Sequence, residues 1–468
     1  MSDIKESVDM SGFQHKKTIM ASYGTTYFVN ELIQGVLILL LFFFYEVEIG
    51  LSAWWTGLGL LIYALWDAFN DPLLGYLCDR PFRFTKKLGR RFPWIIVGFI
   101  PMLISFVLIF SPPDVDASTQ PLVIFGWLVF TLCLFDTCET FFTTNYVGLF
   151  PDKFRGREER IKAQTISVYI GIIGVVFANL LPMFIIGFGN IGSYVSMAWI
   201  CVIISLICFA LMIPGVRDDK KTVENYLVKY EEQEKENFFK VLKETFKNKS
   251  FIAYLLFYML YLTLTTMVQA SFVYWVNFII FGTSNDVLYV MVLMLIGVMI
   301  GIPLWVLYNK KSGDNRKTML YAGVLFASVT FSFSFLTNLS TLLIVVVIWG
   351  MALGGFWSMH TPTFSDVIDE AISTTGRRRE GFYSGWRRFF GNLAKANQAL
   401  LFALVHELTA FSASVADQSP SADIGILLLF GIIPAVLMGV GAVIFWRFYG
   451  LTPEKTKANR EHIKELNL

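Results

Sequence analysis

Long apolar runs, separated by short polar segments, recur along the whole chain. Most are 20 to 30 residues long, about the length that an α-helix needs to cross the hydrocarbon core of a bilayer. We predict twelve transmembrane helices at residues 22–45, 51–78, 93–111, 121–149, 162–187, 194–214, 251–281, 287–308, 318–336, 341–365, 382–409 and 423–448. The pattern therefore predicts an all-α polytopic membrane protein.

Composition supports lipid as the solvent of these helices. Of the 468 residues, 55% are hydrophobic and only 16% are charged, whereas about a quarter of an average soluble domain is charged. The polar start, MSDIKESVDMSGFQHKK, lacks an apolar core, so we expect no cleaved signal peptide. The five cysteines all fall in predicted spans or at their ends, which favours helix packing over disulfides or metal ligation.

The basic residues are distributed unevenly between the predicted loops. Six alternate loops contain no Lys or Arg: residues 46–50, 112–120, 188–193, 282–286, 337–340 and 410–422. The intervening loops and the two tails hold nearly all 38 basic residues. Since positive residues mark the cytoplasmic side, we predict a multi-pass plasma-membrane protein with both termini in the cytoplasm.

A long polar stretch divides the predicted helices into two sets of six. The residues from 217 to 250 are rich in Glu and Lys, with interspersed aromatic and aliphatic residues, which predicts an amphipathic helix on the membrane surface. The expected organisation is a tail (1–21), an N-terminal bundle (22–214), a linker (215–250), a C-terminal bundle (251–448) and a second tail (449–468).

Five acidic residues lie well inside predicted spans of the N-terminal half: Glu31, Asp67, Asp71, Asp136 and Glu139. A charge at the bilayer centre costs about 2.5–3.5 kcal/mol on insertion scales. These acids must therefore face water, a counter-ion or one another. The alternative to a functional role is a structural one, in which they hydrogen-bond between helices.

Helical spacing places these acids with other oxygen-bearing side chains. Asp67, Asn70 and Asp71 share one helix face. The fourth predicted helix, residues 121–149, carries another such stripe, formed by Asp136, Glu139, Thr140 and Thr143. Carboxylate, amide and hydroxyl oxygens suit a small hard cation. Two converging stripes therefore predict a site for sodium, lithium or a proton.

The C-terminal half contains fewer intramembrane charges. Lys395 is the only Lys or Arg that we place deep in the membrane, and it either contacts substrate or forms a structural ion pair. Asp366 and Asp369 end one span near the cluster 377–379 and near Arg387 and Arg388, which open the next span. These residues form either an inner gate, with Arg379 and Arg387 as partners, or solvated helix ends. His406 and Glu407 are expected to snorkel at the outer end.

The run Trp66-Asp67-Ala68-Phe69-Asn70-Asp71-Pro72, followed by a basic loop, resembles the motif of the glycoside–pentoside–hexuronide cation symporters. This melibiose-permease-like family belongs to the major facilitator superfamily. Further matches are Tyr23-Gly24, Pro151 with Glu159-Arg160, and Arg379-Glu380 with Tyr383. The resemblance implies two six-helix bundles around a central cavity and transport by alternating access.

The resemblance also implies roles for individual residues. The family's cation ligands correspond to Asp67, Asn70, Asp71 and Thr140, and its helix-one substrate acid corresponds to Glu31. The expected substrate-binding residues are Glu31, Asp136, Glu139, Thr143, Asn392 and Lys395.

The galactoside site of the family is not reproduced. The positions of its aspartate, tryptophan and arginine hold Thr143, Val147 and Val168, and the position of its lysine holds Asn392. Lys395, one turn further along, takes over the role of that lysine in our interpretation. Asp136 and Glu139 are additions to the family pattern.

We therefore expect a cation-coupled symporter of a sugar or glycoside. The alternatives are a cation-coupled transporter of a lysolipid or an organic acid and, from another class, a receptor or scaffold that transports nothing. No nucleophile–base pair, metal motif or phosphate-binding loop indicates an enzyme. The expected partners are the bilayer, a monovalent cation and a small-molecule substrate. We expect a monomer that needs no cofactor and binds no nucleic acid.

Overall fold

The computed structural model describes residues 15–78, 88–154, 157–218, 246–376, 380–413, 415 and 417–465. All regular secondary structure in these ranges is helical, which confirms the predicted fold class. The amphipathic helix predicted in the linker, and Arg379 of the predicted inner gate, lie outside the described residues.

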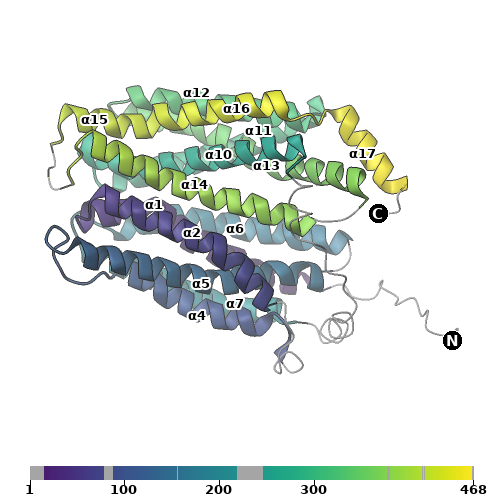
Figure 1. The fold of residues 1–468 in the computed structure, drawn as a ribbon, viewed down its shortest axis with the longest axis horizontal. Helices are drawn as coiled ribbons and strands as arrows, with labels where there is room; N and C mark the ends of the chain where they lie inside the picture. Colours follow the sequence, from purple (N-terminus) through teal and green to yellow (C-terminus); the bar gives the residue numbers. More distant parts are fainter. Residues whose placement is uncertain are drawn as a thin grey trace.

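Six long helices of the first half pack together in the lower part of Figure 1. They are α1 (Lys17–Phe43), which continues into the π-helical turn η2 (Phe44–Glu48), α2 (Ala53–Cys78), α4 (Phe92–Ile109), α5 (Pro121–Lys153), α6 (Arg157–Ile185) and α7 (Ile191–Val216). Within this group, α1 packs most extensively against α6, and α4 against α5.

The second half forms the upper part of Figure 1. Its elements are α10 (Lys249–Tyr274) with η3 (Trp275–Ile279), α11 (Ser284–Ser312), α12 (Asn315–Ser332) with η4 (Phe333–Phe335), α13 (Leu339–Thr375), α14 (Glu380–Leu408), α15 (Pro420–Leu427) with η5 (Leu428–Ile432), α16 (Ile433–Phe448) and the terminal helix α17 (Pro453–Glu465). Counting α15 to α16 as one interrupted helix, each half contributes six long helices to the described structure.

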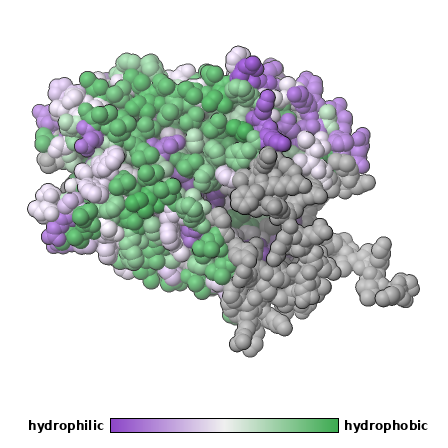
Figure 2. Space-filling model, in the orientation of Figure 1, coloured by the Kyte–Doolittle hydropathy of each residue, from purple (hydrophilic) through white to green (hydrophobic). Residues whose placement is uncertain are grey.

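Ten of these helices are long and apolar enough to cross a membrane, and Figure 2 shows a broad hydrophobic surface around them. The two long helices outside this set, α2 and α14, are 26 and 29 residues long. They carry Asp67 and Asp71 on α2 and Arg387, Arg388 and Lys395 on α14, which lowers their mean hydropathy. They also form the largest contact between the two halves, so these charges lie within the protein.

Close helix packing within each half depends on glycine. A Cβ at Gly174 of α6 would lie 2.5 Å from the backbone oxygen of Phe28 on α1. A Cβ at Gly297 of α11 would lie 2.2 Å from the backbone oxygen of Val347 on α13. Both distances are too short for any side chain, so these two helix pairs can approach as closely as they do only because glycine is present.

Helix α17 lies at the right-hand end of the molecule in Figure 1, which we call the terminus side; the opposite end is the far side. On the terminus side, Asp218 accepts hydrogen bonds from the backbone N–H groups of Arg91 (3.1 Å) and Phe92 (3.0 Å). Burial raises the pKa of Asp218, although these bonds favour its charged form. Arg91 also pairs with Asp152 of α5 at 3.1 Å. The ends of α4, α5 and α7 are thereby held together.

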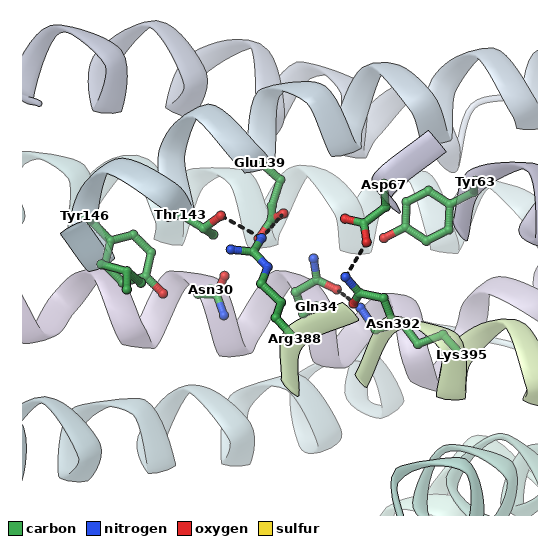
Figure 3. Close-up of a pocket in the computed structure, with 11 residues that line it drawn as sticks. Asn30, Gln34, Tyr63, Asp67, Glu139, Thr143, Tyr146, Arg388, Asn392 and Lys395 are labelled. Atoms are coloured by element: carbon green, nitrogen blue, oxygen red, sulfur yellow. Dashed lines mark hydrogen bonds and ion pairs between the residues drawn. The ribbon is translucent and has the colours of Figure 1, made fainter. Parts of the chain in front are cut away.

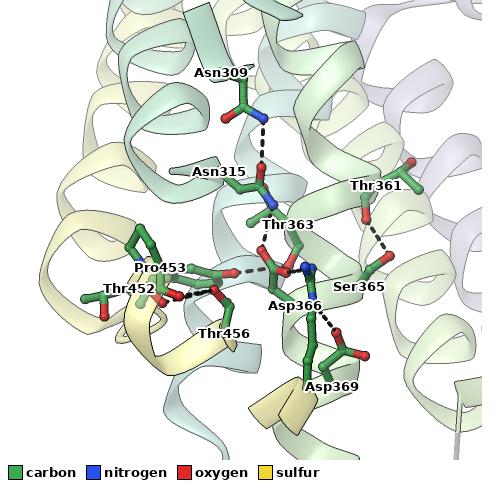
Figure 4. A network of polar contacts seen from close by, with 12 residues as sticks. Asn309, Asn315, Thr361, Thr363, Ser365, Asp366, Asp369, Thr452, Pro453 and Thr456 are labelled. Atoms are coloured by element: carbon green, nitrogen blue, oxygen red, sulfur yellow. Dashed lines mark hydrogen bonds and ion pairs between the residues drawn. The ribbon is translucent and has the colours of Figure 1, made fainter. Parts of the chain in front are cut away.

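Asp366 and Asp369 were predicted to form an inner gate, but their observed basic partner is Arg460. Arg460 of α17 contacts Asp366 at 2.8 Å and Asp369 at 3.2 Å, and Asn315 donates a further 2.8 Å bond to Asp366 (Figure 4). Arg387 instead lies over the rings of Phe364 and Tyr258, with its Cζ 4.6 and 5.8 Å from their centroids. The described acids therefore attach α17 to α13 inside one half and do not bridge the halves.

Candidate functional site

A cavity of about 270 Å³ lies between the two halves. Its walls come from α1, α2, α5 and α14, and Figure 3 shows their polar side chains pointing toward one another. The lining residues are Asn30, Gln34, Tyr63, Asp67, Glu139, Thr143, Tyr146, Val147, Arg388, Asn392 and Lys395. Two acids and two bases therefore line one cavity, in a setting where isolated charges are expensive.

Arg388 connects α14 to the acids of the N-terminal half. Its Nε lies 3.1 Å from Asp71, and its Nη2 lies 3.6 Å from Glu139 and 3.0 Å from the hydroxyl of Thr143. Figure 3 shows the guanidinium between Glu139 and Thr143. One cation thus bridges α2 and α5 and partly neutralises the acids of the predicted cation site.

Three of the four predicted ion ligands, Asn70, Asp71 and Thr140, form one hydrogen-bonded group. The Thr140 hydroxyl donates to Asp71 at 2.8 Å. The Asn70 amide nitrogen lies 3.4 Å from that hydroxyl and donates to Asp136 at 3.0 Å. Both Asn70 bonds use its nitrogen, so its carbonyl oxygen is available as a ligand. The two stripes predicted on α2 and α5 therefore converge.

Two further polar contacts cross the cavity from α14. Asn392 donates a hydrogen bond to Asp67, and Lys395 donates one to Gln34 of α1 at 3.0 Å. With Arg388, these residues occupy positions i, i+4 and i+7 of α14, which lie on one face of a helix. The face of α14 toward the N-terminal half is therefore a polar stripe that binds α1, α2 and α5.

The donor set fits a hard monovalent cation. Within the described part of the chain, no three His, Cys, Asp or Glu side chains lie close enough to hold a metal ion together. Two carboxylates, an amide oxygen and a hydroxyl are instead available at Asp67, Asp71, Asn70 and Thr140. Such neutral and anionic oxygens suit sodium, whereas a transition metal would favour imidazole or thiolate ligands.

The predicted substrate residues separate into two groups. Glu139, Thr143, Asn392 and Lys395 line the cavity. Asp136 is buried behind Asn70 and is not among the lining residues. Glu31 is half-buried on α1 beside Gly171 of α6, and the α1 residues that line the cavity are Asn30 and Gln34. The structure thus places Asp136 with the predicted cation ligands rather than in the substrate wall.

Several lining residues were missed by the sequence-based prediction: Asn30, Gln34, Tyr63, Tyr146 and Arg388. The prediction that Lys395 is the only deep basic residue was wrong, because Arg388 reaches the same cavity. The sequence does contain a signal for Arg388, because its spacing from Asn392 and Lys395 places all three residues on one helix face. The amides and tyrosines gave no comparable signal, since such residues are common in membrane helices.

A second, mainly apolar cavity of about 40 Å³ adjoins the first. The two cavities share the lining residues Gln34, Tyr63 and Lys395. The apolar walls of the second are Leu37, Ile38, Leu41, Phe42, Leu60 and Leu132. A polar chamber and an apolar one therefore meet at the same three side chains.

In the described part of the chain, twelve long helices form two halves with a charged cavity between them, which is the arrangement of a membrane transporter of the major facilitator type. The model of the family described as "MFS/sugar transport protein" matches residues 22–452, and the chain belongs to this family. It is therefore a multi-pass transporter and not an enzyme.

Relatives and solved structures agree with this assignment. The chain is 22% identical to the sodium-dependent lysophosphatidylcholine symporter 1-A of Danio rerio over 87% of this chain and 80% of that protein. It is 24% identical to the uncharacterized symporter YnaJ of Bacillus subtilis (strain 168) over 93% and 92% of the two chains.

Among solved structures, a bacterial homolog of the human lysosomal transporter Spinster, in an inward-facing and unoccupied conformation, has a TM-score of 0.63. It is 11% identical, and the match covers 95% of this chain and 98% of that one. The nucleoside transporter NupG has a TM-score of 0.60 at 13% identity, over 92% and 100% of the chains. At these identities the likeness shows the fold alone.

Proposed function

We propose that this protein is a sodium-coupled symporter of a lysophospholipid with a zwitterionic head group. The observation that supports this proposal is the pair of adjoining cavities, one charged and one apolar, beside a group of oxygen ligands. A single-chain amphiphile has the matching two-part chemistry. The sodium-dependent lysophosphatidylcholine symporters among the relatives support the same substrate class.

The charged cavity suits a head group that carries both signs. Arg388 and Lys395 could bind a phosphodiester, because both are donors to anionic oxygens. Glu139 could face a quaternary ammonium group, and Tyr63 offers an aromatic ring for the same cation. An uncharged sugar would leave four charged side chains with fewer partners.

The apolar cavity is the proposed entrance for the acyl chain. Its present volume, about 40 Å³, is close to that of one water molecule. Binding must therefore displace side chains such as Phe42 and Leu60 to admit the chain. Burial of each CH₂ group would contribute about 0.8 kcal/mol, so the chain supplies binding energy for this rearrangement.

Coupling would follow from competition at Asp71. Sodium bound at Asp67, Asn70, Asp71 and Thr140 would replace the guanidinium of Arg388 as the counter-ion of Asp71. Arg388 would then be available for the phosphate of the substrate. Each ligand would raise the affinity for the other by the same factor, as linkage requires.

We also assign the sidedness of the protein from its basic residues. Described basic residues of the predicted inner loops, such as Arg91, Lys153 and Lys310, lie at the terminus side, so that side is proposed to face the cytoplasm, in the plasma membrane. Polar contacts between described residues of the two halves occur at the central cavity and on the far side. This distribution supports a conformation that is closed to the outside.

A sugar remains the second candidate substrate. The family's description as sugar transporters and the amides of Asn30, Gln34 and Asn392 in the cavity wall favour it. Amide side chains can donate and accept hydrogen bonds with sugar hydroxyls. An organic acid would use Arg388 and Lys395 alone.

The decisive experiment measures uptake of labelled lysophosphatidylcholine into proteoliposomes, with albumin added to remove lipid that has not crossed. We expect an inward sodium gradient to stimulate uptake and an equal gradient of choline chloride to have no effect. Asp71→Asn should abolish this stimulation. Asp116→Asn, at an exposed far-side loop, is the matched control and should transport as the wild type does.

Two results would contradict the proposal, one for the lipid substrate and one for the cation site. If sodium binds to the purified protein but no gradient drives lysolipid uptake, the lipid assignment is wrong and labelled sugars become the next substrates to test. If Asp71→Asn retains full sodium stimulation, the cation site is placed wrongly. Size-exclusion profiles of both variants show whether a loss reflects misfolding.

A further inference from the structure

A second arginine of α14, Arg387, faces the C-terminal half and has no acidic partner among the described residues. Its Cζ lies 4.6 Å from the ring centroid of Phe364 on α13 and 5.8 Å from that of Tyr258 on α10. Arg388, the next residue, instead pairs with two acids of the N-terminal half. No described carboxylate lies within ion-pair distance of Arg387. Arg387 is therefore a cation that aromatic rings hold in place and that no described acid neutralises.

Stacked rings from α10 and α13 surround this guanidinium. Tyr258 stacks on Tyr254 with 5.9 Å between the ring centroids, and it lies 5.9 Å from the ring of His360. Tyr254 also stacks on Phe364 at 5.3 Å. We call Arg387 and these four residues the Arg387 cage. All five belong to the C-terminal half, so the cage is separate from the predicted sodium ligands on α2 and α5.

The Arg387 cage contains hydrogen-bond donors that the described residues do not use. The Tyr254 hydroxyl donates to the backbone oxygen of His360 at 3.1 Å and is also the polar contact of the guanidinium. The Tyr258 hydroxyl makes no hydrogen bond with any described residue. A guanidinium has five N–H donors and no acceptor, so most of the donors of Arg387 are left for a ligand. An oxyanion complements both the fixed positive charge and these donors.

The Arg387 cage is accessible from the space between the halves. Tyr258, His360 and Arg387 are half-buried, whereas the other two members behind them are buried. Helix α10 packs against both α1 and α14, and the charge of Glu31 on α1 acts on the Tyr258 hydroxyl together with that of Arg387. Along α14, which begins at the terminus side in Figure 1, Arg387 comes before every residue that lines the central cavity. The cage therefore lies on the terminus side of that cavity.

We propose that the Arg387 cage is a second binding site for the phosphodiester of the substrate, reached as the head group leaves toward the terminus side. While sodium is bound, the phosphate contacts Arg388 and Lys395. When sodium leaves, Arg388 returns to Asp71, and Arg387, which no described acid holds, takes over the phosphate. The identity of the ligand rests on the proposed function, but the independence of this site from sodium is a property of the cage itself.

Binding of glycerophosphocholine to the purified full-length protein tests this site. This soluble head-group analogue carries the phosphodiester and has no acyl chain, so it does not partition into detergent. We expect calorimetric titration in sodium-free N-methylglucamine chloride to show binding that Arg387→Gln weakens about tenfold. In saturating sodium the same variant should lose less than about threefold, because Arg388 is then free to bind the phosphate. Arg387→Lys should restore part of the sodium-free affinity, since it keeps the charge.

Arg447→Gln is the matched control. Arg447 also lies over an aromatic ring, with its Cζ 5.9 Å from the centroid of Phe448, but it is exposed at the end of α16. Both affinities of this variant should therefore equal those of the wild type. An unchanged sodium affinity of lipid-free Arg387→Gln shows that its fold is intact, because the Arg387 cage holds none of the predicted sodium ligands.

Three results would overturn the proposal. The first is an absence of sodium-free binding in the wild type. The second is an equal loss in Arg387→Gln with and without sodium, which would give Arg387 a merely structural role. The third is binding of inorganic phosphate as tight as that of glycerophosphocholine, which would make the cage a site for free phosphate. A failure of lysophosphatidylcholine uptake is a separate outcome, since it contradicts the proposed function and leaves the sodium-free binding unaffected.

Discussion

The guanidinium of Arg388 lies 3.1 Å from the carboxylate of Asp71, so a cation from one half of the protein occupies the site where the coupling ion is expected. Glu139 and Thr143 hold the same guanidinium from α5. The contact partly neutralises Asp71 and also links α14 to α2. A bound sodium ion would have to compete with it.

Replacement of Arg388 tests this competition. Arg388→Gln removes the internal cation, so the sodium affinity of the purified protein should rise three- to tenfold, the range expected for a partly exposed ion pair worth about 1 kcal/mol. Transport should fall, because the link between ion release and movement of α14 is lost. Calorimetric or fluorescence titration with sodium chloride measures the affinity.

Arg387→Gln is the matched control for this experiment. The neighbouring guanidinium lies over Phe364 and Tyr258 and does not enter the cavity lining, so its removal should leave sodium affinity unchanged. Equal affinity in wild type and Arg388→Gln would show that Arg388 and sodium do not share Asp71.

The hydroxyl of Thr140 provides a second test of the ion site. Thr140→Val keeps the shape of the side chain but removes one oxygen ligand, so we expect sodium affinity to fall about tenfold, the equivalent of ~1.4 kcal/mol. Thr140→Ser should restore most of it. The same titration measures all variants.

Thr137 supplies the control for Thr140. It lies on the same helix, where its hydroxyl donates to a backbone oxygen of α5 and accepts from Trp66. Thr137→Val should therefore bind sodium normally. If Thr140→Val also bound sodium as tightly as the wild type, Thr140 would have to be removed from the ligand set.

The sequence predicts the helices and the convergence of α2 and α5 because both signals are local. Apolar run length identifies the helices, and the spacing of Asp67, Asn70 and Asp71 places them on one face. A charge in the membrane is costly when it faces lipid, so the polar face of α2 and the polar face of α5 are expected to face each other. The resemblance to glycoside–pentoside–hexuronide symporters adds roles, and those roles stay predictions.

Contacts between distant segments were not predictable in the same way. We predicted that Glu46 lies in a loop. No local sequence pattern shows that the helix α1 continues through this residue as the π-helical turn η2. Its partner His406, which was expected to snorkel, is buried and lies 360 positions away in the sequence. Arg388 was placed at the membrane surface because its depth depends on how α14 crosses α2. Such pairings are decided by the packing of the two halves.

The attachment of α17 gives a prediction about stability on the terminus side. Asp366 is buried, with 3% of its surface exposed, and holds both Asn315 and Arg460. Asp366→Ala leaves the amide of Asn315 without its partner, which costs about 1–3 kcal/mol. Arg460→Ala removes a side chain that is 57% exposed, so it should cost less than about 1 kcal/mol.

Two measurements separate these effects. In detergent, the thermal unfolding temperature should fall clearly for Asp366→Ala and only slightly for Arg460→Ala. Hydrogen exchange should nevertheless increase over residues 453–465 in both variants, because each breaks the contact between α17 and α13. Lys457→Ala, at an exposed position of α17, should change neither quantity. Unaltered exchange in Arg460→Ala would mean that other contacts, and not the Asp366–Arg460 pair, hold α17 in place.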